Sequence, residues 1–458
     1  MARAGKYELD MTHGPMATNI LRFALPLMLS GAISLSFNAA DVMVIGKFVG
    51  DYSQAAVTSS SSVIGLLTNL FMGLSAGVNV VVARALGEGK KASVSAAVHT
   101  GMAFGVLVGV LLAVLGVAAT PMLLDLVGCP SDLLDLAALY MRCVFLGMPA
   151  SALYQFGSAL LRAGGDTKRP MYFVTLSGVV NVVLNLIFVL WFHWDVAGVA
   201  IATALSNGLS AYLVIRCLMQ EEGSLHFEPM QLRIDFAAAK EIVRIGIPAG
   251  IQTSLFSIAN VVVQTSVNSL GPIAMAGSGA ATNIGGFGTV AASAFYQSAM
   301  TFSAQNRGAG KLERIDKALG LNLLFTAVGT TVLMLGICWA GPWLLGIYTD
   351  DPEVIAVGML RLVWCYGSYA LYAMILTFMA TLRALGYSLY PTIVALVGNC
   401  GLRVVWIVTV FEKVHTPTVL FMGFPATWTV TVTVLAISFL VLRPKTYAKI
   451  LAQAAQQE

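Results

Sequence analysis

Long apolar stretches alternate with short polar connections along the whole chain of 458 residues. Each stretch stays apolar over about 20 residues, which is enough for one α-helix to cross a bilayer. A membrane β-barrel would show alternating segments of about 10 residues instead. The pattern therefore predicts an all-α polytopic membrane protein with twelve transmembrane helices. The expected spans are residues 20–46, 54–82, 94–124, 136–161, 170–192, 196–219, 243–269, 274–303, 318–345, 356–381, 389–411 and 418–442.

The composition agrees with this class, since 58% of the residues are hydrophobic and only 10% are charged. A soluble globular chain carries about 25% charged residues, so a soluble enzyme is excluded. The six cysteines have no CxxC spacing, and we expect them to pack as small apolar side chains. No histidine stands at metal-ligand spacing from another histidine or a cysteine, so neither a structural zinc site nor any other cofactor is expected.

The distribution of basic residues predicts the orientation in the membrane. Lysine and arginine accumulate in cytoplasmic connections, and all but five of the 26 fall on one side of the predicted spans. Both termini are therefore expected in the cytoplasm. The first apolar run lacks a cleavage site of small residues, so we interpret it as a true span rather than a signal peptide.

The sequence contains an internal repeat. Residues 20–26 match 242–248, and residues 161–170 match 382–391, in almost the same register. Each half holds six spans, an even number, so both halves enter the membrane in the same direction. This predicts two pseudo-symmetric six-helix lobes with a central cavity, an architecture suited to alternating access by rocking of the lobes.

The repeat divides the chain into five expected parts. They are a cytoplasmic tail at 1–19, a first lobe at 20–220, a cytoplasmic linker at 221–241, a second lobe at 242–442 and a cytoplasmic tail at 443–458.

Four segments resemble the multidrug and toxic compound extrusion (MATE) transporters. They are MTHGP at 11–15, RFALP at 22–26, DVMVIGKFVG at 41–50 and LRAGGDTKRP at 161–170. With the repeat, the resemblance covers nearly the whole chain. It implies a multidrug efflux antiporter of the bacterial inner membrane that exports amphipathic, often cationic, compounds against a Na⁺ or H⁺ gradient.

One acidic residue stands out, because Asp41 alone among the 22 Asp and Glu residues lies deep inside an apolar run. A carboxylate at that depth costs roughly 2.5 to 3.5 kcal/mol on insertion scales, so it is a functional candidate by default. The alternative is that Asp41 caps a helix break or pairs with Arg142 or Arg403.

Three polar residues are expected at one depth, since Asp41, Asn185 and Thr203 lie eight or nine residues from the outer boundary, roughly 12 to 14 Å below it. Asn181 lies one turn from Asn185 on the same helix face. These oxygen ligands could hold Na⁺ or hydrogen-bond a protonated acid. The alternative is interhelical hydrogen bonding. The MATE resemblance implies that Asp41, Asn181 and Thr203 belong to a cation site. Asn185 departs from the Asp found there in many relatives, which weakens the electrostatic attraction for Na⁺.

Polar stripes in the second half could line a substrate cavity. Residues at multiples of four form one helix face, and facing lipid they would be costly. The stripes consist of Gln252, Asn260, Gln264 and Asn268 in the seventh span and of Gln297, Thr301 and Gln305 in the eighth. Hydrogen bonding between helices is the equal alternative. Arg403, inside the eleventh span, needs a partner or a wet cavity, whereas Arg142 and Arg361 are expected to snorkel to the outer interface.

Several functions remain to be weighed against a cation-coupled exporter. A lipid-linked precursor flippase or a metabolite exporter of the same superfamily is the alternative interpretation. A channel would give current rather than coupled exchange, and a membrane enzyme would need convergent catalytic residues. We therefore expect a small-molecule substrate and contact with membrane lipid, with no ATP, no nucleic acid and no enzymatic activity. We also expect a monomer, because one chain supplies both lobes.

Overall fold

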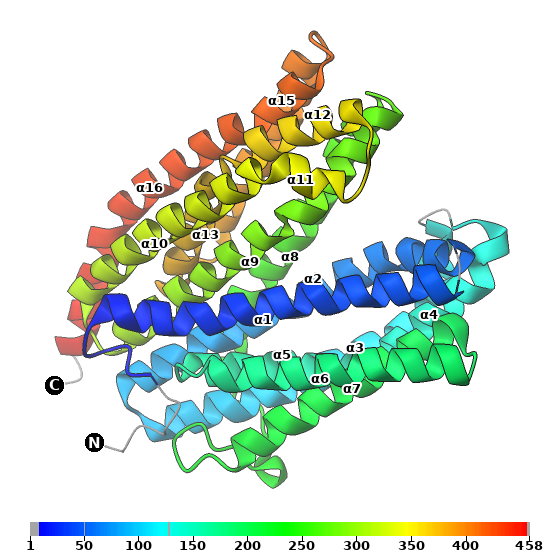
Figure 1. Ribbon diagram of the computed structural model, residues 1–458. Helices are drawn as coiled ribbons and strands as arrows, with labels where there is room; N and C mark the ends of the chain where they lie inside the picture. Colours follow the sequence, from blue (N-terminus) through cyan, green and yellow to red (C-terminus); the bar gives the residue numbers. More distant parts are fainter. Residues whose placement is uncertain (1–8, 50, 127–128, 456–458) are drawn as a thin grey trace. The chain divides into compact units, whose positions relative to one another are not determined.

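The structure is a computed structural model that describes residues 9–49, 51–126 and 129–455 (Figure 1). These residues form helices and connections, and no strand occurs among them. Hydrocarbon offers the backbone no hydrogen-bond partner, so an apolar segment must bond its own N–H and C=O groups within a helix. The predicted all-α membrane fold is confirmed.

The helices of the first half include short π-helical and 3₁₀ segments, named η. In chain order they are α1 (Met16–Val44), η1 (Ile45–Val49), α2 (Asp51–Glu88), α3 (Lys91–Leu126), η2 (Ser131–Leu133), α4 (Leu134–Leu146), α5 (Met148–Ala163), α6 (Lys168–Leu186), η3 (Ile187–Trp191) and α7 (Asp195–Met219). The 3₁₀ turn η4 (Pro229–Gln231) lies in the connection to the second half.

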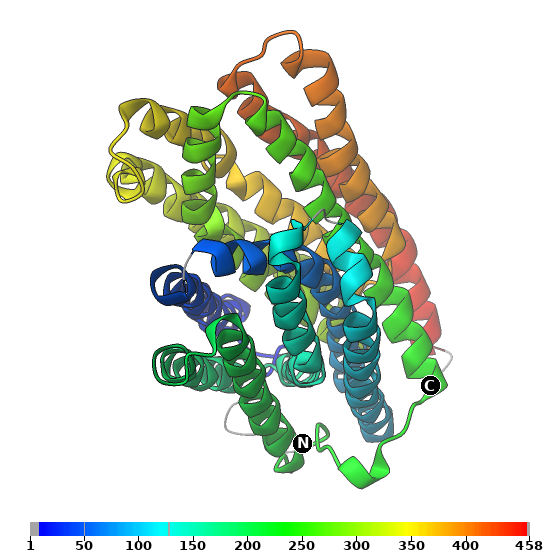
Figure 2. The same cartoon turned by 90° about the vertical axis from the view of Figure 1, so that its right-hand side faces the viewer.

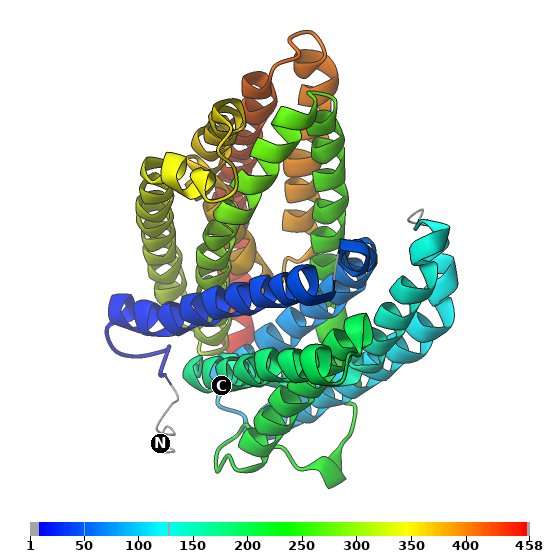
Figure 3. The same ribbon diagram turned by 45° about the vertical axis from the view of Figure 1, so that its right-hand side comes forward.

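The second half is interrupted by π-helical segments more often. Its elements are α8 (Phe236–Asn268), α9 (Pro272–Gly308), α10 (Leu312–Trp339), α11 (Gly341–Gly346), α12 (Pro352–Arg361), η5 (Leu362–Tyr366), α13 (Tyr369–Ala384), α14 (Leu389–Leu396), η6 (Val397–Gly401), α15 (Leu402–Trp406), η7 (Ile407–Phe411) and α16 (Pro417–Ala455). The series from α14 to η7 forms one predicted span, and α16 packs beside it (Figure 3).

Each of the twelve predicted spans coincides with one helix or with a series of helical segments. Within the described residues, ten helical stretches are long and apolar enough to cross a membrane, and α4 and α5, bent by 43°, make up to eleven. The remaining span is α9, which has 37 residues but is rich in glycine, serine and alanine. The twelve-span layout therefore holds, with α9 as its least apolar member.

The chain separates into two compact units. Unit 1 is Leu29–Gly250 with the tail up to Asp10, and unit 2 is Ile251–Glu458 with Met11–Met28. The units differ from the predicted lobes at the first helix of each half. The first turns of α1 belong to unit 2, where Phe23 and Phe302 pack edge to face with ring centroids 6.0 Å apart. The first turns of α8 belong to unit 1.

The backbone follows the repeat seen in the sequence. The helices α5 and α13 begin and end at equivalent positions of the repeat, and α6 and α14 begin at equivalent positions too. The connections before α6 and α14 both turn on a left-handed glycine, Gly165 at φ +90° and Gly386 at φ +92°. Such φ values exclude other residues without strain, so both halves use one turn geometry.

The predicted tails and linker have different limits in the structure. The last helix, α16, continues to Ala455, so most of the predicted tail at 443–458 extends this helix. The linker at 221–241 is irregular only as far as Asp235, after which α8 begins; Figure 2 shows it as the green loop that leads into this helix. Within unit 1 the backbone N–H groups of Glu228 and Asp235 donate to His99 and Thr100 of α3. These bonds attach the linker to unit 1.

Candidate functional site

The four residues of the predicted cation site meet in unit 1. Asn185 Nδ2 donates to Asp41 Oδ1 at 2.5 Å and to Asn181 Oδ1 at 3.3 Å. Asn181 Nδ2 in turn donates to Thr203 Oγ1 at 3.3 Å. Three elements, α1, α6 and α7, therefore place four polar side chains in one connected cluster, as their shared depth predicts. The alternative pairing of Asp41 with Arg142 or Arg403 does not appear among the ion pairs of the described residues.

The cluster keeps one buried acceptor without a partner. Asn185 is fully buried, and its Oδ1 atom has no hydrogen-bond partner in the described structure. A buried carbonyl oxygen without a donor costs free energy, and a bound cation or a proton donor would remove that cost. Carboxylate, amide and hydroxyl oxygens are also the hard ligands that Na⁺ accepts. The donor set therefore fits Na⁺ or a proton on Asp41.

Apolar side chains close one end of this cluster. The buried residues Val44, Ile45, Val189 and Val199 pack together where α1 passes into η1 and α6 passes into η3. On its other side Asp41 borders a cavity of about 250 Å³, which Asn181 and Thr203 also line. Asp41 is the one charged residue among the described residues that line it. Unit 1 therefore contains a small acidic cavity.

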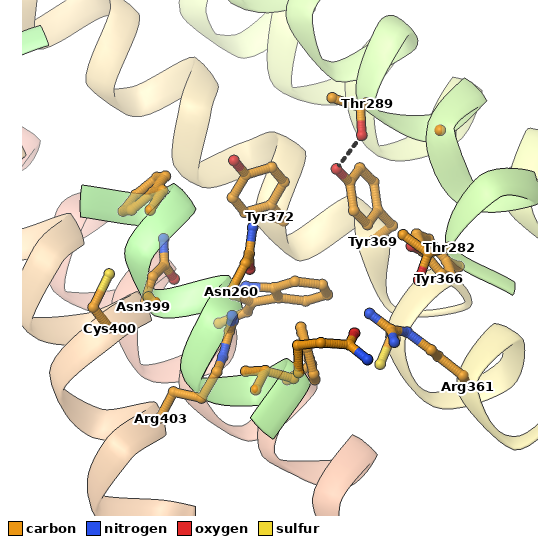
Figure 4. Close-up of a pocket in the computed structure, with 18 residues that line it drawn as sticks. Asn260, Thr282, Thr289, Arg361, Tyr366, Tyr369, Tyr372, Asn399, Cys400 and Arg403 are labelled. Carbon is orange, nitrogen blue, oxygen red and sulfur yellow. Dashed lines mark hydrogen bonds between the residues drawn. The ribbon is translucent and has the colours of Figure 1, made fainter. Parts of the chain in front are cut away.

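Unit 2 contains a second cavity, of about 380 Å³ (Figure 4). Three residues predicted for a substrate site line it, namely Asn260, Gln264 and Arg403. Arg403 is buried, and its Cζ atom lies 4.0 Å from the ring centroid of Phe424. The prediction of a cavity next to Arg403 is therefore confirmed in its geometry.

The other predicted substrate residues do not reach this cavity. Gln252 is buried, and its Oε1 atom accepts hydrogen bonds from Arg383 and Thr392. Asn268 accepts a hydrogen bond from Gln264 at 2.9 Å. Gln297, Thr301 and Gln305 lie on α9 away from the cavity lining, and Thr301 Oγ1 donates to the carbonyl of Gln297 at 2.9 Å. For these residues the alternative of helix packing describes the contacts better.

Two polar residues of this cavity were not predicted to belong to it. Arg361, expected to snorkel, lines the cavity instead; it donates to Ser278 and lies 5.7 Å from the ring centroid of Phe421. Asn399 stands one turn before Arg403 and points into the same space (Figure 4). The spacing of four residues between Asn399 and Arg403 is the signal that could have identified the former.

The comparisons with known proteins identify the family. A MatE family profile matches residues 26–187 and again residues 248–409. The chain belongs to the MatE family. It is therefore a multi-pass membrane transporter chain, and the two matches, one per half, agree with the internal repeat.

Relatives of this MatE chain extend over most of its length. The probable multidrug resistance protein YoeA of Bacillus subtilis (strain 168) is 26% identical over 417 residues, covering 89% of this chain and 90% of the relative. A protein of Shewanella oneidensis named FAD transporter is 27% identical over 350 residues, covering 74% and 76%. The crystal structure of a MATE P26A mutant matches with a TM-score of 0.90 at 18% identity, covering 98% of this chain and 100% of the other. That structural match supports the fold alone.

The LRAGGDTKRP segment of this MatE chain positions the helix that carries both asparagines. The buried carboxylate of Asp166 accepts hydrogen bonds from the backbone N–H groups of Lys168 and Arg169, at 3.0 and 3.1 Å, and so caps the start of α6. The Arg169 side chain pairs with both Asp166 and Glu221. The motif thereby fixes the position of Asn181 and Asn185 relative to α7.

The MTHGP segment binds within unit 2. Asn306 Nδ2 donates to the carbonyl of Met11 at 3.1 Å, and Lys311 Nζ donates to the carbonyl of Thr12 at 3.0 Å. These bonds join the tail to the connection between α9 and α10.

Proposed function

We propose that this protein is a secondary active antiporter that exports amphipathic small molecules across a bacterial inner membrane in exchange for H⁺ or Na⁺. The observation that supports it most is the cluster of Asp41, Asn181, Asn185 and Thr203 inside the membrane-spanning part of unit 1. Cation coupling needs a group that gains and loses positive charge at this depth. Membership of the MatE family supports the transporter part of the proposal.

Asp41 is the group that carries the coupling ion in this proposal. Na⁺ would bind the Asp41 carboxylate together with the free oxygen of Asn185 and its neighbours. A proton would convert Asp41 into a donor to those same oxygens. Either event neutralises a charge that is costly within the membrane, so the loaded and empty states differ in which conformation they favour. This difference is what alternating access requires of a coupled transporter.

The substrate and the topology complete the proposal. Both termini lie in the cytoplasm, as the distribution of basic residues favours, and one chain acts as a monomer. The acidic cavity of unit 1 supports a cationic substrate, whereas the cavity of unit 2 does not, because it is lined by Arg361 and Arg403.

A metabolite exporter is the second candidate. The relative named FAD transporter favours it, because its similarity covers about three quarters of both chains. A metabolite exporter would keep the coupling site and differ in the compound that it carries.

Gradient-driven export from proteoliposomes tests the proposal. The protein is reconstituted with ethidium or FAD inside, and a pH gradient and a Na⁺ gradient are imposed separately. Wild type is expected to export at least one compound under one gradient, and Asp41→Asn is expected to reduce that export to background while folding normally.

The matched control is Asp125→Asn, at the exposed end of α3. It removes one carboxylate far from the cluster and should export at the wild-type rate. Export by Asp41→Asn at the wild-type rate would remove Asp41 from the mechanism. Absence of export under both gradients would reject the antiporter proposal for these compounds.

A further inference from the structure

The cavity of unit 2 contains positive charge without a counter-charge. Arg361 and Arg403 line it, and no Asp or Glu occurs among its described lining residues. Other arginines of the chain have acidic partners, such as Arg84 with Glu241 and Arg443 with Asp316. A buried guanidinium without an anion is costly, and stacking on an aromatic ring offsets only part of that cost. The cavity therefore favours a ligand that carries negative charge.

The cavity also has an excess of buried hydrogen-bond donors. In the described structure Arg361 Nε, Arg403 Nε and Trp428 Nε1 are buried without a partner. Asn399 has neither a donor nor an acceptor for its buried side-chain amide. In the close-up the two guanidinium groups point toward the cavity from opposite sides (Figure 4). Because most of these free atoms are donors, the matching ligand group is an acceptor with several oxygens, such as a carboxylate or a phosphate.

Aromatic rings form much of the remaining wall. Tyr366 and Tyr369 stack with ring centroids 5.7 Å apart, and Tyr372 and Trp428 are 5.5 Å apart. The Thr289 and Tyr369 hydroxyls are hydrogen-bonded at 2.9 Å, which holds the Tyr369 ring in place (Figure 4). Rings positioned in this way favour a planar apolar group at offset-stacking or edge-to-face distance. The volume of about 380 Å³ lies within the range of small-molecule sites.

We propose that the cavity of unit 2 binds an organic anion, with a planar aromatic ring between the tyrosines and Trp428 and a carboxylate or phosphate on Arg361, Arg403 and Asn399. The inference rests on the proposed function, since it names the class of substrate that the transporter carries. It differs from the cationic class that the MATE resemblance implies.

Three probes that share one ring and differ in charge test the proposal. They are 2-naphthoate, the neutral 2-naphthamide and the cationic 2-naphthylmethylammonium. Binding to the purified full-length protein in detergent is measured by equilibrium dialysis, with protein-free micelles as the blank. We expect 2-naphthoate to bind about tenfold or more tightly than the amide, and the cation to bind most weakly. Equal affinity for acid and amide in the wild type would overturn the proposal without any variant.

Variants then locate the binding site. Arg403→Gln and Arg361→Gln should each remove most of the preference for the acid over the amide, whereas Arg403→Lys should keep part of it because the charge remains. The control is Arg443→Gln, which removes an arginine whose partner is Asp316 outside the cavity lining. If Arg403→Gln does not fold, Asn399→Asp serves instead; its added carboxylate should favour the cation over the acid. A preference that survives Arg361→Gln and Asn399→Asp would overturn the assignment to this cavity.

Binding and transport can fail separately. The dialysis experiment has no ion gradient, so its outcome does not depend on Asp41. Loss of the acid preference with intact gradient-driven export would reject the substrate class and leave the antiporter standing.

Discussion

The cavities of units 1 and 2 are lined by equivalent positions of the repeat but carry opposite charge. In the register that aligns 20–26 with 242–248, Asn38 and Asp41 of unit 1 correspond to Asn260 and Val263 of unit 2. The acid of the first cavity is thus replaced by a valine in the second. One backbone arrangement therefore serves either sign of charge, and a few side chains decide which one.

The walls of the two cavities differ in the same way. In the register that aligns 161–170 with 382–391, Thr203 and Asn207 of unit 1 correspond to Phe424 and Trp428 of unit 2. Hydroxyl and amide groups around Asp41 solvate a small cation, whereas the rings in unit 2 stack on Arg403 and leave room for a planar group. The comparison indicates that the repeat determines where a cavity lies and that its chemistry is specified separately in each half.

The largest expected effect comes from placing an acid in the second cavity. Val263→Asp puts a carboxylate at the position equivalent to Asp41, where it can pair with a cavity arginine. We expect the affinity for 2-naphthoate to fall by about a hundredfold, measured by equilibrium dialysis. Val263→Asn has nearly the same shape without the charge and should lower the affinity far less. Equal losses in both variants would mean that charge is not what distinguishes the cavities.

A second acid in the first cavity should sharpen its preference for Na⁺. Asn185→Asp adds a carboxylate beside Asp41, and we expect about a tenfold gain in affinity for ²²Na⁺, measured by scintillation proximity on purified protein. The control Asn207→Asp adds an acid to the same cavity outside the hydrogen-bonded cluster. A gain of the same size in the control would show that Na⁺ responds to the cavity's net charge and not to the cluster.

The smallest expected effect concerns the turns before α6 and α14. Asp166→Asn weakens the cap of α6 and should lower the free energy of unfolding by about 1 to 2 kcal/mol. At the equivalent position, Tyr387→Phe removes the oxygen that accepts a hydrogen bond from Thr446, with an expected loss of about 1 kcal/mol. Thermal unfolding in detergent compares the two. A larger loss from Tyr387→Phe would reverse the assignment of the more strongly held turn to the first half.

The fold and the Asp41 cluster could be predicted because both depend on local counting. Apolar length gives each span, and the distance of Asp41, Asn185 and Thr203 from one boundary gives their common depth. Helix packing then brings them together without any further information. The register of the repeat follows from short motifs for the same reason.

The lining of the second cavity could not be predicted by such counting. The span of Arg361 continues directly into η5, and Asn399 lies within η6. A π-helical turn contains more residues than an α-helical turn, so the faces that follow no longer repeat every four residues. Arg361 therefore turns into the protein where a regular helix places it at the interface. Gln252 and Asn260 share a face, but they lie at different depths and meet different neighbours.

The free cysteines make the second cavity observable without any label being engineered. Cys365 and Cys400 line this cavity, whereas no cysteine occurs among the described lining residues of the first. Cys400 is only partly buried, so its thiol is open to small alkylating reagents. A ligand seated between the two arginines would cover that thiol and slow its alkylation. Peptide mass spectrometry of the unmodified protein can therefore follow occupancy of one cavity while the other stays silent.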